Sequence, residues 1–131
     1  MARQILIVDD SSSMRHLLAD ACYGLGDVDV SEACDGLDAL KRLATARFDL
    51  MFVDVNMPVL DGLKLIRRVR ATPEHRPMRI CVCTTEADTE EQSRQLGADY
   101  FLRKPVSRRE VDRVLADAFP EEGAGKRPGG G

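Results

Sequence analysis

Unbroken apolar runs recur along the chain, and the stretches between them carry apolar residues at helical spacing. A continuous apolar run is typical of a strand buried on both faces of a parallel sheet. Two further segments, at residues 27–33 and 100–102, are alternating or short and therefore predict strands at the edges of the sheet. The two-sided runs, which predict central strands, lie at residues 5–8, 50–53 and 78–83, the last of them interrupted by Arg79.

Helices are predicted between these strands. In the first, apolar residues recur at i, i+3, i+4, i+7, i+8 and i+11 from Met14, behind serines that can cap it. The third follows Asp61-Gly62, and the fifth opens at Ser107 with capping-box spacing to Glu110. The second follows Asp35-Gly36, and its apolar residues are Leu37, Leu40, Leu43 and Ala44.

The fourth helix, expected at residues 88–96, is polar nearly all round. A helix with so little to bury should be held weakly, and weakly held elements are the ones that rearrange. Asp99 is interpreted as a turn residue. Solvent exposure is expected for both histidines and for the basic side chains of the third helix: His16, His75, Lys64, Arg67, Arg68 and Arg70.

Strands that alternate with helices predict an α/β fold with a parallel sheet. The central and edge positions assigned above fit the strand order 2-1-3-4-5, the doubly wound, flavodoxin-like arrangement. One domain is expected over residues 1–119, followed by a Gly/Pro-rich tail at 120–131 that we predict to be disordered.

The composition argues against nucleic-acid binding and against a membrane protein. The net charge of −3 offers no basic surplus for nucleic acid. No apolar run is long enough to span a membrane and the N-terminus lacks a signal peptide, so a cytoplasmic protein is expected. We also expect a monomer or a weak dimer. The cysteines lack paired metal-site spacing and are interpreted as small buried hydrophobes: Cys22, Cys34, Cys81 and Cys83.

Polar side chains follow four of the five predicted strands. Taken singly, each could be a turn, a cap or a surface charge. Because the carboxyl ends of parallel strands meet at one edge of the sheet, where such folds bind ligands, we expect these residues to converge. They are Asp9 and Asp10 after the first strand, Asp54 after the third, Thr84 after the fourth and Lys104 after the fifth.

The convergence of carboxylates has chemical consequences. Two carboxylates about 4 Å apart repel by roughly 4 kcal/mol at an effective dielectric of 20, so the cluster must take up a proton or a cation. Oxygen ligands of this kind suit Mg²⁺, and a facing ammonium group and hydroxyl indicate an anionic guest. Because an aspartate can be a nucleophile, the set predicts phosphoryl transfer onto Asp54, with Mg²⁺ and Lys104 neutralising charge.

At these positions the chain resembles the response-regulator receiver domains of two-component systems, and within that family the single-domain chemotaxis regulators. The resemblance spans residues 4–119. It rests on Ile-Leu-Ile-Val-Asp-Asp-Ser at the start, Asp54-Val-Asn-Met-Pro, Leu60-Asp-Gly, Thr84, and Lys104-Pro105 after Gly97-Ala-Asp-Tyr-Phe.

The resemblance implies a role for each site residue. Asp54 would accept the phosphoryl group, and Asp10, Asp54 and the backbone carbonyl of Asn56 would bind Mg²⁺, with Asp9 assisting through water. Lys104 would pair with the phosphoryl group, and the bond before Pro105 is often cis in the family. Thr84 and Phe101 would form the switch.

The resemblance also implies partners. A histidine kinase would supply the phosphoryl group, and an effector protein would bind the face made by the fourth helix, the fifth strand and the fifth helix. The domain would then be no enzyme, because its chemistry is confined to its own aspartate.

Two positions depart from the family pattern. Phe101 replaces the tyrosine of the most similar chemotaxis proteins, so an inward ring has no phenolic hydrogen bond. Thr85 stands where Ala or Gly is usual, and we expect it to crowd the phosphoryl group and to slow its transfer.

Other functions remain open at this point. The chain fits a phosphorelay intermediate or a scaffold that works without phosphorylation. A Mg²⁺-dependent small-molecule phosphatase is disfavoured, because Asn56 stands where the haloacid dehalogenase pattern has a second acid and no capping domain is present. A Ca²⁺ loop is excluded by Pro58 and the missing distal Glu.

Overall fold

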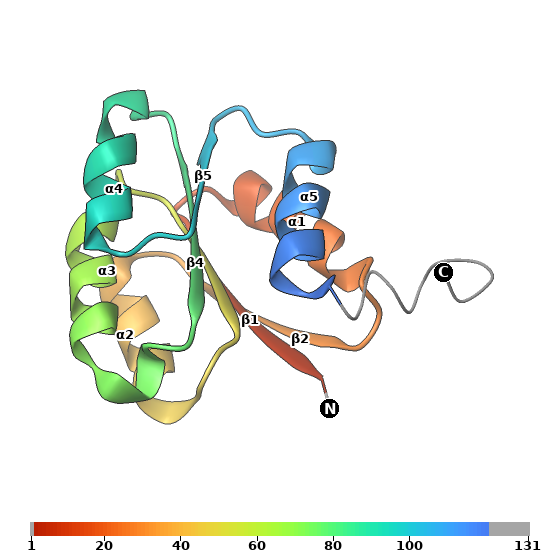
Figure 1. The fold of residues 1–131 in the computed structure, drawn as a ribbon, viewed down its shortest axis with the longest axis horizontal. Coiled ribbons are helices and arrows are strands. Elements are labelled where there is room, and N and C mark those ends of the chain that lie inside the picture. Colours follow the sequence, from red (N-terminus) through yellow and green to blue (C-terminus); the bar gives the residue numbers. More distant parts are fainter. Residues whose placement is uncertain (1, 121–131) are drawn as a thin grey trace.

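Five parallel strands form the middle layer of the molecule (Figure 1). Their order is β2-β1-β3-β4-β5. The structure, a computed structural model, describes residues 2–120. The order is the one predicted, with the continuous apolar runs in the three central strands. The strands are β1 (Arg3–Val8), β2 (Val28–Ala33), β3 (Leu50–Val53), β4 (Arg79–Thr84) and β5 (Tyr100–Arg103).

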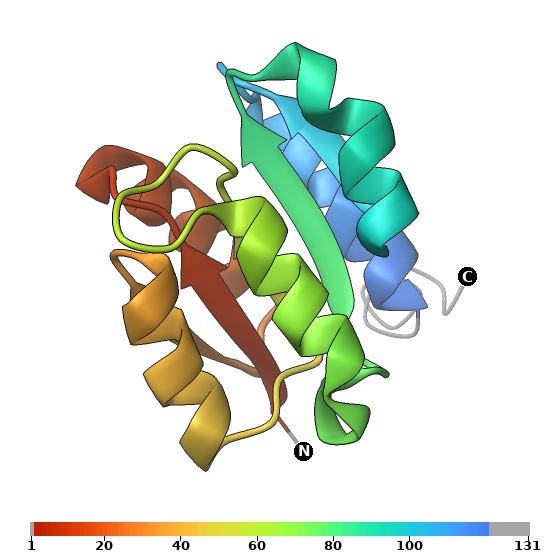
Figure 2. The same ribbon diagram turned by 90° about the vertical axis from the view of Figure 1, so that its left-hand side faces the viewer.

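Helices cover both faces of the sheet: α1 and α5 on one face, α2, α3 and α4 on the other (Figures 1 and 2). Four begin at a capping side chain that accepts a backbone N–H, and Ser107 and Glu110 complete the predicted capping box. The helices are α1 (Ser12–Tyr23), α2 (Gly36–Thr45), α3 (Gly62–Ala71), α4 (Glu90–Leu96) and α5 (Arg108–Ala118), with 3₁₀ turns η1 (Pro73–His75) and η2 (Ala87–Thr89).

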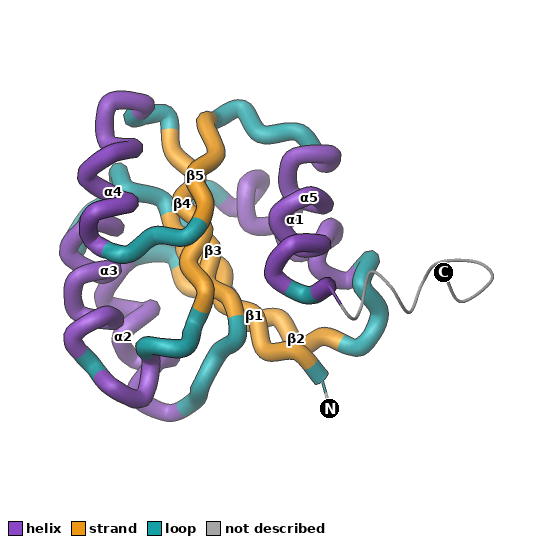
Figure 3. The backbone as a smooth tube through the Cα atoms, in the orientation of Figure 1, coloured by secondary structure: helices purple, strands orange, loops and turns teal. Residues whose placement is uncertain are grey.

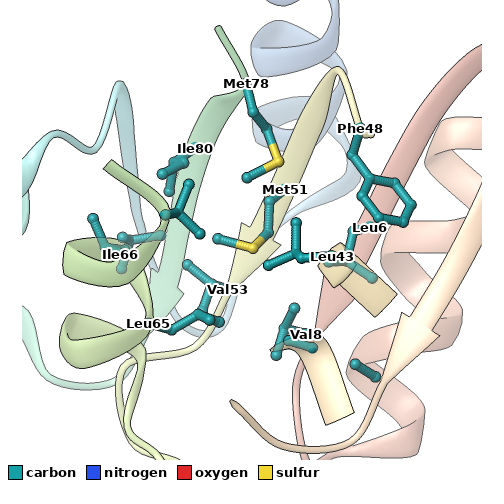
Figure 4. Close-up of a cluster of buried hydrophobic side chains, with 14 of the residues drawn as sticks. Leu6, Val8, Leu43, Phe48, Met51, Val53, Leu65, Ile66, Met78 and Ile80 are labelled. Atoms are coloured by element: carbon teal, nitrogen blue, oxygen red, sulfur yellow. The ribbon is translucent and has the colours of Figure 1, made fainter. Parts of the chain in front are cut away.

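Each face of the sheet has its own hydrophobic core. Successive residues of a strand point to opposite faces, so the central strands must be apolar throughout. Ile5, Leu50 and Phe52 pack toward α1 and α5. The core beneath α2 and α3 includes Leu6, Val8, Leu43, Met51, Val53, Leu65, Ile66 and Ile80 (Figure 4).

Three apolar side chains lie elsewhere than the pattern indicated. Leu37 of α2 is 47% exposed, and Ala44 is exposed as well. The buried face of α2 is instead made by Gly36, Ala39 and Leu43, which follow one another at a spacing of three and four residues. Cys34 is exposed, because it lies in the turn just after β2, whereas the other cysteines are buried as predicted.

Two charged residues make structural contacts that the sequence did not indicate. Arg70, expected to face solvent, is half-buried and donates to the backbone carbonyls of Arg76, Met78 and Gly97. It also pairs with Asp99, 3.0 Å away, whose carboxylate accepts from the backbone N–H of Ile80. His16 is exposed as expected, but His75 is only half-exposed.

The fourth helix is shorter than predicted. Regular α4 spans seven residues after η2, and Ser93 is its only buried residue. The Ser93 hydroxyl has no hydrogen-bond partner within the described residues. Among residues 2–120, no helix is long and apolar enough to cross a membrane. The predicted tail at 120–131 lies outside the described residues except for Pro120.

Candidate functional site

Asp9 and Asp54 extend two neighbouring strands by one residue. The backbone N–H of Asp54 donates to Val8 O of β1 (3.0 Å), and that of Asp9 donates to Ala33 O of β2 (3.1 Å). Both carboxylates are buried, at 1% and 6% residue exposure. The hydrogen bonds of the sheet therefore fix the backbone of both acids at the carboxyl edge of the sheet. In Figure 3 this edge is at the upper end, where the loops after β4 and β5 begin.

Lys104 joins the two acids. Its Nζ lies 2.8 Å from Asp9 Oδ2 and 3.0 Å from Asp54 Oδ2. The backbone N–H of Lys104 donates to Thr84 O (2.9 Å), so β4 positions the residue. The Lys104-Pro105 bond is cis, as the family resemblance implied. One ammonium group thus partly offsets the charge of two buried carboxylates.

A divalent cation fits the acidic group. One carboxylate oxygen from each of Asp9, Asp10 and Asp54 lies within 4.8 Å of the others. Asp10 is exposed, so the group is open to solvent on its side. Asn56 is adjacent, since its backbone N–H donates to Asp54 Oδ1 (3.1 Å). An all-oxygen set with an open side suits Mg²⁺, which retains water ligands.

The burial and the close contacts of these groups shift the pKa values of Asp9 and Lys104. Burial raises the pKa of Asp9 above its ordinary value, although hydrogen bonds from Lys104 and from the Ser11 N–H oppose the shift. Burial alone would lower the pKa of Lys104, but hydrogen bonds to Asp9 and Asp54 raise it. Lys104 therefore remains an ammonium ion at neutral pH. Burial disfavours the ionised form of Asp9 when no cation is bound.

Arg15 supports the acidic turn and was missed by the sequence reasoning. Its guanidinium donates to Asp9 O (2.7 Å) and pairs with Glu32 of β2 (2.9 Å). A cation near a helix N-terminus is disfavoured by the helix dipole. That unfavourable placement in the first part of α1 was the signal that Arg15 serves another purpose.

The threonines after β4 differ in placement. Thr84 is fully buried, and its hydroxyl accepts from the backbone N–H of Glu86 (3.1 Å). Thr85 is exposed and lines, with Ser11 and Lys104, an open hollow of about 440 Å³. Phe101 is not part of the acidic group: it pairs with Val82 in the sheet, and its ring packs against the core under α2 to α4.

The loop after Asp54 is held close to the site. Gly62 begins α3 and donates its N–H to Val55 O (2.9 Å). A methyl group on Gly62 would overlap the carbonyl oxygen of Asp54, so only glycine allows this approach. Within the loop, Val59 has φ of 72°, a backbone conformation that β-branched residues rarely adopt.

The chain is similar to known proteins over most of its length. A family model described as the response regulator receiver domain matches residues 5–116. The chain is 34% identical to chemotaxis protein CheY-3 of Vibrio cholerae serotype O1 over 118 residues, covering 88% of this chain and 91% of that protein. It is 32% identical to chemotaxis protein CheY of Pseudomonas aeruginosa, covering 88% and 95% of the two chains.

Solved structures show the same fold. CheY4 of Vibrio cholerae superposes with a TM-score of 0.81 at 32% identity, over 90% of this chain and 99% of that one. The receiver domain of sensor histidine kinase PA1611 from Pseudomonas aeruginosa, which has a magnesium ion coordinated in its active-site cleft, gives a TM-score of 0.80 at 28% identity, over 92% and 99%. By sequence and by fold, the chain belongs to the response regulator receiver domain family.

Proposed function

We propose that this receiver domain accepts a phosphoryl group on Asp54 from a histidine kinase, in a reaction that requires Mg²⁺. The observation that supports it most directly is the convergence of Asp9, Asp10 and Asp54 within 4.8 Å, with Lys104 Nζ at hydrogen-bond distance from two of them. Such a pocket accepts a cation and an anion together more readily than it remains empty.

In the proposed reaction a carboxylate oxygen of Asp54 attacks the phosphorus atom of a phosphohistidine. The new P–O bond forms as the P–N bond breaks, and the electron pair stays on the histidine nitrogen. Bound Mg²⁺, held by Asp10, Asp54 and the Asn56 carbonyl with Asp9 assisting, would neutralise charge on the transferred oxygens. Lys104 would exchange its contact with Asp54 for one to the phosphoryl group, while Thr84 would give up Glu86 N–H to donate to it.

The proposed output is a change in the face formed by α4, β5 and α5, which would then bind an effector protein. The short α4 buries a single serine, so little packing holds it in one position. Phe101, half-buried on β5, would respond to movement of Thr84. Because the similar proteins from Vibrio cholerae and Pseudomonas aeruginosa are chemotaxis proteins, we propose a role in chemotaxis or motility signalling.

Phosphorylation can be tested with the purified chain, Mg²⁺ and acetyl phosphate, with intact-mass spectrometry as the readout. We expect one added phosphoryl group in the parent, none when Mg²⁺ is chelated before acetyl phosphate is added, and none in Asp54→Ala. Asp88→Ala is the matched control, since Asp88 is exposed and outside the acidic group. Phosphorylation that persists in Asp54→Ala would refute the assignment. A chain that binds neither Mg²⁺ nor beryllofluoride would instead be the phosphorylation-independent scaffold.

A further inference from the structure

A groove runs between the last turns of α2 and α3 and reaches η1. It consists of two adjoining hollows of about 360 and 540 Å³ that share Leu43, Ala44, Thr72 and His75. In Figure 2 the two helices lie side by side in front of the sheet, and η1 lies at the lower end of α3. The groove therefore belongs to the face of the molecule covered by α2 and α3.

The groove lies at the opposite end of the sheet from the acidic group. Asp9 and Asp54 follow the carboxyl ends of β1 and β3, whereas helices in a doubly wound fold run back toward the strands' amino ends. The groove is lined by the later residues of α2 and α3, so it is separate from the proposed phosphorylation site.

The floor of the groove is apolar. Val69 is 1% exposed and Leu43 is 5% exposed, while Leu40 is half-buried beside them. Ala44 contributes a small exposed side chain that leaves the hollow open. An apolar floor that remains open to solvent is suited to receive apolar side chains from a second molecule.

The walls of the groove carry positive charge. Arg68 of α3 lines one hollow and Arg47, just after α2, lines the other; both are exposed. Among residues 2–120, neither guanidinium has a carboxylate oxygen within 4.0 Å. The lining of the groove includes one acid, Glu74. Arg47 and Arg68 lie on the two sides of the apolar floor and have no carboxylate partner among residues 2–120. They would complement a ligand in which carboxylates flank a row of apolar side chains.

We propose that this groove binds an acidic amphipathic helix of a partner protein. Leucine-type side chains spaced i, i+4 and i+7 would enter between α2 and α3, and glutamates on either side would reach Arg47 and Arg68. Because the groove is remote from the acidic group, binding there does not depend on the state of Asp54. The chain would thus carry a second docking surface, distinct from the proposed α4-β5-α5 output face.

The probe is a pair of capped peptides of about 14 residues with the same leucine spacing, one with flanking glutamates and the other with lysines. We expect the glutamate peptide, at up to about 1 mM, to shift the backbone amide NMR signals of residues 40–47, 68–72, 74 and 75, and the lysine peptide to leave them unchanged. Higher salt should weaken the binding, since it screens the arginines. The same shifts should appear in Asp54→Ala.

Adjacent residues of α3 provide a matched pair of variants. Arg68→Glu should weaken binding of the glutamate peptide roughly tenfold. Arg67→Glu makes the same charge change one residue away and should leave binding within about twofold, because Arg67 lines the hollow between α3 and α4 instead. Glu74→Gln should strengthen it. Amide dispersion verifies that each variant is folded.

Several results would overturn the proposal. They are equal binding of both peptides, shifts centred outside the groove, no shifts at the highest peptide concentration, or equal losses in Arg67→Glu and Arg68→Glu. If vesicles of anionic phospholipid shift the groove amides and the glutamate peptide does not, the surface contacts membranes and the proposed occupant is wrong. None of these outcomes bears on phosphorylation of Asp54.

Discussion

Asp9 is the residue at which burial and charge conflict most directly. Its pKa is raised above the ordinary 3.8, chiefly by burial, so the folded protein binds that proton more tightly than the unfolded chain. The stabilisation from this proton is complete below pH 3.8 and is lost as the pH rises through the folded-state pKa. At neutral pH, the ionised Asp9 therefore lowers the free energy of unfolding of the metal-free protein.

Asp9→Asn should remove this cost. We expect the free energy of unfolding at neutral pH to rise by on the order of 1 kcal/mol without Mg²⁺. Urea unfolding followed by circular dichroism, from pH 3.8 up to neutral pH, measures it: the parent should lose stability relative to the variant as pH rises above 3.8. Mg²⁺ should stabilise the parent more than the variant. Parallel pH profiles for the two proteins would contradict this explanation.

Val59 is strained by its backbone conformation. A β-branched residue at φ 72° crowds its own carbonyl, and the side chain is 75% exposed, so it gains little from packing. Val59→Asn should stabilise the protein by about 1 kcal/mol, because asparagine tolerates this region. Thermal unfolding measures the change. Val106→Asn, at a half-buried valine without positive φ, is the control and should not stabilise.

Thr85 borders the proposed phosphoryl site through the hollow that it shares with Lys104. Replacement by alanine would remove the methyl and hydroxyl groups that we expect to crowd the incoming group. Thr85→Ala should therefore raise the rate of phosphorylation by acetyl phosphate several-fold, on the order of 1 kcal/mol in activation free energy. Time-resolved intact-mass spectrometry measures the rate. An unchanged rate would show that Thr85 does not obstruct transfer.

At the scale of elements, α4 has a polar sequence but packs against the molecule with one side chain buried. Its buried face is a serine whose hydroxyl finds no partner in the described part of the chain. An unsatisfied buried hydroxyl costs about 1–3 kcal/mol, so α4 is held in place against a penalty. This is a physical reason, independent of family, for α4 to move when its neighbours change.

Ser93→Ala should stabilise the protein by about 1 kcal/mol, since it removes the unpaired hydroxyl and favours the helix. Gln95→Ala is the matched control, because Gln95 is exposed in the same helix and changes helix propensity alone. Urea unfolding of both variants separates the contributions. If the two gain equally, burial of the hydroxyl carries no cost.

The helix and strand pattern could be predicted from sequence because it depends on local periodicity. The central strands followed from two-sided apolar runs, and Ser107 with Glu110 predicted the start of α5. The buried face of α2 could not, because Gly36 and Ala39 are too small to give a hydrophobic signal while exposed Leu37 is strong. Small residues reveal their contacts only once the partner element is placed.

At the scale of the whole molecule, long polar side chains join elements that are distant in sequence. Lys104 contacts Asp9 and Asp54 together, Arg15 contacts Asp9 and Glu32, and Arg70 ties the end of α3 to the start of β4. The strand-end rule predicted that Lys104 would face the acids. The contacts of Arg15 and Arg70 were not predictable, because the targets of a flexible side chain are set by tertiary geometry and leave no periodic pattern.

Arg70→Leu should destabilise the protein by about 2–3 kcal/mol, because it leaves several carbonyl groups near Gly97 and Met78 without their donor. Arg67→Leu, at an exposed position of the same helix, should change stability by less than about 0.5 kcal/mol. Arg70→Lys should recover only part of the loss, since an ammonium group cannot reproduce the planar fork. Urea unfolding compares the three, and equal losses for the two leucine variants would refute this role.

The backbone hydrogen bonds of Asp9 and Asp54 continue the central ladder beyond the ends of β1 and β3. In a hydrogen-exchange experiment, these two amides should exchange only when the whole protein unfolds. The Asn56 N–H is bonded within its own loop and should exchange through local opening. The acidic pair is therefore assembled once, during folding, and incoming ligands need not bear the entropy of bringing it together.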